Sequence, residues 1–447
     1  INGDPNPAGP GPKENDVVSN IDGEYVGFPQ RTMTGSFVEV PVAEGALDLV
    51  AGGTVHAFVH PTMPHLSQTV ISKWDDAAKS GWALQIDDGH LVFVISDNGK
   101  TQRVSCTSGL FPEIWYSVVV SVNTESKTVS LTQVQLVNRV NSRLGCVSSI
   151  ESDDSVSATL DVNPVETQSA LLIGGIACGR DGDDDLVKGH FNGKLEAPKM
   201  FADAGIAPDD LHGGGLPSAP IAHWDFSKHI TRDGIGTDKV SDVSGNGYDG
   251  LAINQPDMGM TGRNWDGREE KFVHCPEQYG AFWFHEDSLD DCRWKQSFEL
   301  EIPANLRSGI YAVRLVSNGQ VDWVPFFVAP PVGAATAKVA LLIPTFSYLA
   351  YANTQVMQTS ALAQPVIGII TTLSDHDLEL GEFSKEYGLS HYDVHCDGRG
   401  VMYSSWRRPI FNMRPDHRHE YGSIWQFPAD LHLVDWLEAK GVEYDII

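Results

Sequence analysis

Short apolar runs alternate with turn residues through the first half of the chain. Between Gly35 and about Leu211 the runs include GSFVEVPV, HLVFVI, WYSVVVSV and ALLIGG, separated by breakers such as DDG and DNGK. Alternation of apolar and polar positions is clear in SLTQVQL. Many short strands with regular turns predict an antiparallel sandwich or jelly roll. We therefore expect a jelly roll over residues 34–225, preceded by an extended polar segment at 1–33.

The pattern changes after the predicted jelly roll. Residues 226–297 are aromatic, acidic and irregular, which predicts a connecting segment that packs between domains or against another subunit. Residues 298–332 contain three apolar runs, FELEIP, GIYAVRLV and VDWVPFFVAP. Three strands are too few for an independent sandwich. We expect them to be a partial immunoglobulin-like sheet whose first strands precede Ile1.

An α/β pattern begins near residue 333. KVALLIP and VIGIITTL are continuous apolar runs, as in buried parallel strands. PADLHLVDWLEAKG predicts a helix, with Pro428 near its start and Gly441 after its end, and VEYDII predicts the next strand. Residues 333–447 are therefore expected to be the first part of a flavodoxin-like α/β domain that is incomplete at its C-terminal end. We expect further sequence at both ends of the chain.

Charge and composition narrow the class of protein. Among 447 residues, 31 Lys and Arg face 59 Asp and Glu, which gives a formal net charge of −28. Such a chain is repelled by nucleic-acid phosphates and by anionic membranes. No run of 18 apolar residues occurs, and the six cysteines form no CxxC pair. We expect a cytoplasmic protein with free, mostly buried thiols, without nucleic-acid or membrane partners.

Two segments carry unusually dense candidate chemistry. Ligands of open α/β sheets bind beyond the carboxyl ends of the strands. TFSYLAYANT follows KVALLIP and contains Tyr348 and Tyr351. Downstream, GLSHYDVHCDGRGVMYSSWRRPI combines histidines, aspartates, tyrosines and arginines among glycines. Polar and aromatic groups this dense indicate a site, although a lone tyrosine there is more often a buried ring with a hydrogen-bonded hydroxyl.

The residues alone leave several kinds of functional site to consider. A zinc site is opposed by the missing HExxH motif and by Gly398 and Gly400, which disfavour a long helix. GxSxG and P-loop motifs are absent, so serine hydrolase and P-loop nucleotide sites lose their usual anchors. The acidic loop within residues 285–291 could bind a hard cation. Alternatively, its carboxylates are solvated or paired with arginine. The residues concerned are His391, His395 and Asp397 for zinc, His417 and His419 as a second, surface or carbonyl-bonded pair, and His285, Glu286, Asp287, Asp290 and Asp291 in the acidic loop.

The β-rich half resembles a known superfamily. The order SFVEVP, WALQIDDGHLVFVI, WYSVVVSV, LLIGG and GHFNGKLEAPKMF is similar to a laminin-G/concanavalin-like jelly roll. In that fold FNGKLEAPKMF is a late strand followed by a short helix, and AHWDFS with VSDVSGNGYDG resembles its closing edge. Such domains often bind glycans or calcium, and a purely structural role is equally open.

A second resemblance runs from Gly3 to Ile447. The motifs HWDFS, GRNWDGREE, HCPEQYGAFWFHEDSLDDCRW, SYLAYAN, HYDVHCDGRGVMYSSWRRPI and GSIWQFPADLHLVDWL resemble those of the N,N-dimethylformamidase large (beta) subunit family. That family hydrolyses dimethylformamide to dimethylamine and formate at one Fe(III), bound by two tyrosines and a glutamate. The resemblance implies Tyr351, in YLAYAN, and Tyr392, before DGRG, as metal ligands. The glutamate and a neighbouring catalytic histidine, in a His–Pro–Glu motif, are expected beyond Ile447.

The chemistry suits this assignment. Phenols ionise near a pKa of about 10, so two phenolates at neutral pH need a strong local cation. Hard anionic oxygens suit ferric iron, which polarises an amide carbonyl and acidifies water. His395 and Asp397 are second candidates, as residues that orient the ligands, and Arg407 and Arg408 are expected to pair with acids at an interface.

The resemblance also implies partners. In the family the large subunit associates with a small, helical alpha subunit, and the pairs dimerise further. Two alternatives stay open: a family member with another small amide or metal, and a glycan-binding or structural jelly-roll protein without catalysis.

Overall fold

The computed structural model describes residues 33–136, 151–181, 184–212, 215–294, 296, 298–317, 320–355, 368, 373, 375–419 and 423–447. They form two compact units, one spanning Gly35–Ser288 and the other Leu289–Ile447 with the described residues before Gly35. The expected strand VIGIITTL and the expected segment 1–33 fall almost entirely outside the described residues. Each unit is described by itself below.

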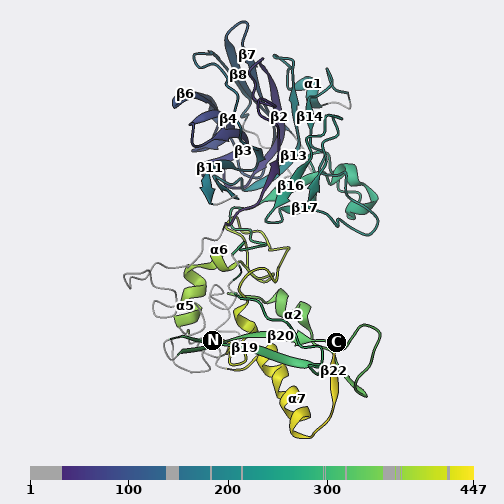
Figure 1. Cartoon of the computed structure of the whole chain (residues 1–447). Coiled ribbons are helices and arrows are strands. Elements are labelled where there is room, and N and C mark those ends of the chain that lie inside the picture. Colours follow the sequence, from purple (N-terminus) through teal and green to yellow (C-terminus); the bar gives the residue numbers. More distant parts are fainter. Residues whose placement is uncertain are drawn as a thin grey trace. The chain divides into compact units, whose positions relative to one another are not determined.

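The first unit is a sandwich of two large antiparallel sheets (Figure 1). One 8-stranded sheet has the order β15 (Lys239–Val240), β16 (Gly250–Ile253), β1 (Phe37–Val40), β10 (Leu171–Ile173), β3 (Gln68–Asp75), β4 (Ser80–Asp87), β5 (His90–Asp97) and β6 (Lys100–Gly109). The other has the order β17 (Asp257–Met260), β18 (Ala281–Phe284), β13 (Gly193–Phe201), β2 (Gly53–Pro61), β7 (Trp115–Asn123), β8 (Thr128–Leu136) and β9 (Asp154–Thr159), with β14 (Ala222–His223) beside β13. The expected late strand is β13, and the short helix α1 (Asp209–His212) follows it.

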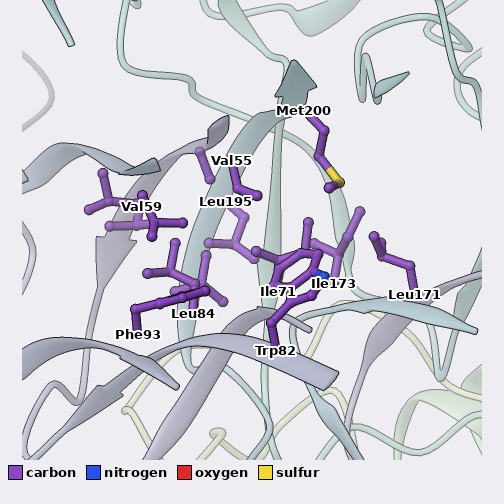
Figure 2. Packing of buried hydrophobic residues seen from close by; sticks show 14 of the residues in the cluster. Val55, Val59, Ile71, Trp82, Leu84, Phe93, Leu171, Ile173, Leu195 and Met200 are labelled. Atoms are coloured by element: carbon purple, nitrogen blue, oxygen red, sulfur yellow. The ribbon is translucent and has the colours of Figure 1, made fainter. Parts of the chain in front are cut away.

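The core lies between the two sheets. Alternate side chains of each strand point inward, so the period-2 pattern of the sequence becomes one apolar layer. Figure 2 shows this packing, with residues of β2 and β13 above residues of β3, β4, β5 and β10. Trp82 is 1% exposed, and its indole N–H donates to the Leu47 carbonyl at 3.0 Å. A buried ring of this kind contributes both area and a satisfied donor.

The sandwich extends past the boundary expected at residue 225. Residues 226–297 were expected to be an irregular connecting segment, yet β15, β16, β17 and β18 within it belong to the two sheets. Phe282 and Phe284 of β18 are buried in the sandwich core, and Phe282 stacks on Phe226 with ring centroids 4.2 Å apart. The aromatic residues of AFWF thus alternate as in an ordinary strand. The irregular segment before this strand, which includes η1 (Phe272–His274) and η2 (Pro276–Gln278), hid the alternation in the sequence.

A buried ion pair joins β3 to residues outside the strands of the sandwich. Lys73 of β3 places its ammonium 2.7 Å from Oδ1 of Asp48, and both side chains are fully buried. The ammonium also donates to the carbonyl and hydroxyl oxygens of Thr167, at 3.0 and 2.8 Å. Asp48 accepts the Thr167 backbone N–H at 3.1 Å. Burial lowers the pKa of Lys73, and the hydrogen bond and charge of Asp48 oppose that shift.

The histidine of β14 makes the sandwich sensitive to acid. Burial first, and then the charge of Lys199, lower the pKa of His223 to about 4. Between pH 6.5 and 4 the unfolded chain therefore binds a proton that the folded chain does not, so stability falls as the pH falls. We expect a loss of about 1–3 kcal/mol from this group across that window. His223→Gln should reduce this pH dependence in urea titrations, whereas His65→Gln, at an exposed site of the same unit, should leave it unchanged.

The second unit begins with a two-stranded antiparallel hairpin, β19 (Gly309–Ser317) and β20 (Gln320–Val328). Gly309 pairs with Val328, and the register continues without a break to Ser317 and Gln320. Of the three strands expected for a partial immunoglobulin-like sheet, two are present as β19 and β20, and the third is wrong because residues 298–303 (FELEIP) have no strand pairing in the described structure. Phe298, Leu300 and Ile302 are each at least 43% exposed, which explains why an apolar run alone did not make a strand.

The α/β pattern near the end of the chain has the expected parallel pair. β21 (Val339–Leu341) pairs in parallel with β22 (Tyr444–Ile446), and α7 (Phe427–Ala439) precedes β22, with Pro428 in its first turn. Ile343, Tyr348, Phe427, Leu437 and Ile446 form its core. A wider doubly wound sheet is not seen among the described residues, and Val339 is 41% exposed, so β21 is not the fully buried strand that KVALLIP predicted.

The remaining elements are short. In the sandwich unit they are the hairpin strands β11 (Ile176–Asp181) and β12 (Asp184–Lys188), and in the second unit α2 (Thr345–Ala350), α5 (Asp375–Glu382), α6 (Ser384–Tyr387) and η3 (Phe411–Met413). Across the described residues, no helix combines the length and apolar character needed to cross a membrane. The five described cysteines are free thiols, of which Cys106 and Cys292 are buried.

Candidate functional site

The two tyrosines expected to bind metal lie side by side in the second unit. Tyr351 ends α2, and Tyr392 lies in the loop that follows α6. Their rings stack with centroids 3.9 Å apart and planes 13° from parallel. Hydrogen bonding to Tyr392 is the first cause, and burial the second, that raise the pKa of the Tyr351 phenol. Two phenol groups from segments distant in sequence therefore meet at one point, and Tyr392 is 49% exposed there.

Local hydrogen bonds shape the loop that carries Tyr392. The Asp393 carboxylate accepts the backbone N–H of Ser390 at 2.9 Å, and the Ser390 hydroxyl accepts the N–H of Tyr392 at 3.1 Å. Aspartate and serine favour such turns because their short side chains bond to nearby backbone. The backbone around Tyr392 is thus held by its own neighbours, which leaves the phenol group available to a ligand.

Trp425 completes the aromatic surroundings of the pair. Its ring meets Tyr351 edge-on, with centroids 4.6 Å apart, and the ring of His419 meets Trp425 edge-on at 5.2 Å. Trp425 was not among the residues expected at the site, although it stands in the quoted motif GSIWQFP. No spacing rule links it to Tyr351, so contact in the folded chain was needed to find it.

Tyr348 shows why proximity in sequence does not identify a ligand. It is 1% exposed, and its hydroxyl donates to the Asp430 carboxylate of α7. Burial, and then Asp430, raise the pKa of this phenol well above its ordinary range. Tyr348 is therefore the buried, hydrogen-bonded tyrosine that the sequence offered as the ordinary alternative, and Tyr351 is the one beside a second phenol.

The zinc site that the sequence disfavoured is not formed by its three candidate residues. In the described part of the chain, His391, His395 and Asp397 do not bring their ligand atoms within 4.8 Å of one another. His395 is buried, and Asp397 accepts the backbone N–H of Arg399 at 3.1 Å in a turn. The glycines at 398 and 400 allow that turn in place of a helix. A role for His395 and Asp397 in orienting the tyrosines stays a prediction.

The other charged candidates have structural partners. Asp290 and Asp291 both pair with Arg407, so this part of the acidic loop is paired with arginine. Arg408 is 6% exposed, and its guanidinium donates to the Leu389 carbonyl and the Ser404 hydroxyl, at 2.8 and 2.9 Å. Burial lowers the pKa of Arg408 to about 10. Arg407 thus pairs with acids as expected. Arg408 instead makes buried hydrogen bonds within the loop that follows α6.

Gly388 is required by Arg408. It has φ +77°, and a Cβ placed there would lie 2.0 Å from Nη1 and 2.9 Å from Cδ of the arginine. We expect Gly388→Ala to lower the free energy of unfolding by about 2–4 kcal/mol, since it adds a buried clash to backbone strain. Gly398→Ala is the matched control, because its φ is +81° with no atom within 4 Å of the added carbon. It should cost only about 1 kcal/mol in the same denaturation experiment.

The residues present fit part of a metal centre. Two adjacent phenol oxygens supply hard, anionic donors once deprotonated, and such donors match a small, highly charged cation. Hydrogen bonding to Tyr392, and then burial, raise the pKa of the Tyr351 phenol, and a cation bound beside that phenol would favour its ionised form. Two donors do not complete a coordination sphere, and a further ligand is needed.

Taken together, the folds and this geometry define a class of protein: an antiparallel β-sandwich joined to an α/β unit with a paired-tyrosine candidate metal site. Residues 257–447 match the family described as N,N-dimethylformamidase beta subunit-like, C-terminal. The chain is 50% identical over 454 residues to the N,N-dimethylformamidase beta subunit of Paracoccus aminophilus, and 48% identical over 455 residues to that of Alcaligenes sp.. All of this chain is matched in both relatives, so the resemblance to N,N-dimethylformamidase beta subunits is confirmed along its whole length.

The chain matches only part of each relative. The chain spans 59% of the length of both relatives. Residues 54–176 match the family described as Clostridium neurotoxin, N-terminal receptor binding. A solved Ruminococcus gnavus sialidase CBM40 with bound sialyllactose is 16% identical at a TM-score of 0.31, covering 41% of this chain and 93% of that one.

Proposed function

We propose that the whole protein is an amidohydrolase that cleaves N,N-dimethylformamide, or a similar small N-substituted formamide, to dimethylamine and formate. The observation that carries the proposal is the stacked pair Tyr351 and Tyr392, found in a chain similar along its length to beta subunits of that enzyme. We propose that these two phenol oxygens hold a single Fe(III). The third ligand, a glutamate, and a catalytic histidine are predicted in the sequence after Ile447.

The requirement of the substrate supports a metal. The carbonyl carbon of a tertiary amide is a poor electrophile because of resonance, and its amine is a poor leaving group. A bound ferric ion would polarise the carbonyl and lower the pKa of a water ligand. Tyr351 and Tyr392 would contribute negative charge and a fixed direction of binding, and the ring of Trp425 packs edge-on against Tyr351.

Residues 333–447 are proposed to belong to a larger, flavodoxin-like sheet. The parallel pair of β21 and β22 supports this, because parallel strands are usually covered on both faces. Large apolar side chains around this pair are exposed: Leu342 is 72%, Phe346 is 87% and Trp436 is 53% exposed. They offer surface for further polypeptide, either the remaining domain or a partner subunit.

The name of the relatives supports a multi-subunit assembly. We propose association with a small alpha subunit and further dimerisation of the pairs, in a cytoplasmic enzyme. Co-expression of the full-length beta subunit with a candidate alpha subunit, followed by light scattering, should give a mass of two pairs. A full-length beta subunit that is active and alone in solution would contradict this part of the proposal.

The activity is tested on the full-length protein with its partner subunit. We expect about one iron per beta subunit, a visible phenolate-to-iron absorption band, and release of dimethylamine and formate from dimethylformamide. A strong chelator should remove colour and activity together, and ferric iron should restore both. Activity on other formamides only, or with another metal only, would favour a different family member. Glycan binding by a protein that hydrolyses no amide would favour the non-catalytic alternative.

A further inference from the structure

The segments that carry the two tyrosines are joined immediately beside each of them. The backbone N–H of His391, which precedes Tyr392, donates to the carbonyl of Ala350, which precedes Tyr351, at 3.0 Å. On the other side, the N–H of Gln355 donates to the Asp393 carboxylate at 2.9 Å. These two hydrogen bonds hold the two tyrosine-bearing segments together, one before and one after the tyrosines. Neither bond involves a phenol oxygen.

The side chain of Asn353 makes three further hydrogen bonds to the segments around the two tyrosines. Its side-chain amide nitrogen donates to the carbonyls of Tyr387 and Pro409, at 2.9 and 2.8 Å. Its amide oxygen accepts the N–H of Phe411 at 3.0 Å. Tyr387 and Pro409 stand at the two ends of the loop that contains Tyr392, so one side chain, two residues after Tyr351, ties both ends of that loop together.

The residue type at position 353 is strongly constrained. Asn353 is 2% exposed and has φ +60°, a conformation that asparagine tolerates better than most residues. Two carbonyls need two N–H donors, and the Phe411 N–H needs an acceptor, so a primary amide satisfies all three groups. An aspartate has the same shape but no donor, and a glycine keeps the backbone but makes none of the bonds.

We propose that Asn353 is a positioning residue that sets the spacing of the Tyr351 and Tyr392 phenols. It touches neither metal nor substrate, and acts by fixing the loop of Tyr392 against the end of α2. The metal part of this proposal rests on the proposed function, whereas the spacing of the rings does not. Its loss is expected to separate the rings before any ligand binds, so the effect should be present in metal-free protein.

The test compares two variants of this residue with a matched control in the full-length protein. Asn353→Gly removes all three bonds, and Asn353→Asp removes the two donors. Asn412→Asp is the control, since Asn412 is also buried at 3% exposure and donates to the Tyr348 carbonyl and the Gln426 side chain, at 3.4 and 3.1 Å. Near-ultraviolet circular dichroism of metal-free protein reports the stacked tyrosines, and titration with ferric iron reports affinity and band position.

We expect both Asn353 variants to lose most of the tyrosine-pair dichroism and to bind iron about 10–100-fold more weakly, with a shifted absorption band. The control should keep the dichroism and bind iron within about twofold of the parent. Dichroism and affinity equal to the control in both Asn353 variants would overturn the proposal. If the parent binds no iron, the proposed function fails, and the dichroism still decides the role of Asn353. If Asn353→Gly does not fold, Asn353→Asp, which keeps the acceptor for Phe411, decides it.

Discussion

Tyr351→Phe is expected to abolish iron binding and amide hydrolysis in the full-length enzyme. The substitution removes one phenol oxygen while keeping the ring that stacks on Tyr392 and meets Trp425. A site that loses an anionic ligand binds a trivalent ion far less well, and the electrostatic activation that the ion supplies is lost with it. We expect kcat/KM to fall by at least about 10³-fold, which corresponds to about 4 kcal/mol. Metal content and the visible absorption band should fall together with activity.

Tyr392→Phe should have the same effect, and Tyr348→Phe is the matched control. Tyr348 lies in α2, three residues before Tyr351, and carries the same functional group, but its hydroxyl is buried against Asp430. Its loss leaves a carboxylate without that donor, so it should lower the free energy of unfolding by about 1–3 kcal/mol while the iron stays bound. Retained colour and activity in both Tyr351→Phe and Tyr392→Phe would disprove the ligand assignment.

Asp48→Asn is expected to destabilise the sandwich by about 3–5 kcal/mol, because it leaves the Lys73 ammonium buried without a counter-charge. Asp48 also accepts the Thr167 N–H, and an amide nitrogen at that position would face another donor. Asp48 makes the largest contributions that oppose the lowered pKa of Lys73, and Glu166 and Glu44 make smaller ones. Without Asp48 this pKa should fall further, so the penalty should shrink as the lysine deprotonates at higher pH. Urea unfolding at several pH values measures both effects.

The exposed pair of Lys79 and Asp76 supplies the control for this experiment. Its atoms are 2.6 Å apart, similar to the buried pair, but the Lys79 side chain is 58% exposed. Asp76→Asn should therefore change the free energy of unfolding by less than about 1 kcal/mol. A combined Lys73→Met and Asp48→Leu variant should recover much of the lost stability, since two apolar groups need no counter-charge. Equal effects of Asp48→Asn and Asp76→Asn would show that burial of the pair contributes nothing.

Sequence patterns that depend on neighbouring residues predicted the secondary structure correctly in several places. The alternation in the first half gave the strands of a sandwich, and Pro428 and Gly441 framed α7 closely, because starts and stops of helices depend on local backbone chemistry. The same reasoning was wrong for FELEIP, whose apolar residues find no partner strand among the described residues. It also missed that the strands between Lys239 and Phe284 complete the sandwich, since membership of a sheet depends on pairing with strands far away in sequence.

The amino-acid sequence alone determined the strand-rich first half, the final helix and strand, and, through its resemblance to a family, the two tyrosines to examine. Only the tertiary structure decided that Tyr351 rather than Tyr348 meets Tyr392, that Trp425 borders the pair, and that Asn353 ties the loop beneath it. The physical reason is the range of the interactions. Turns, caps and periodicity are written within a few residues, whereas the meeting of two phenols depends on how distant segments pack and exchange hydrogen bonds.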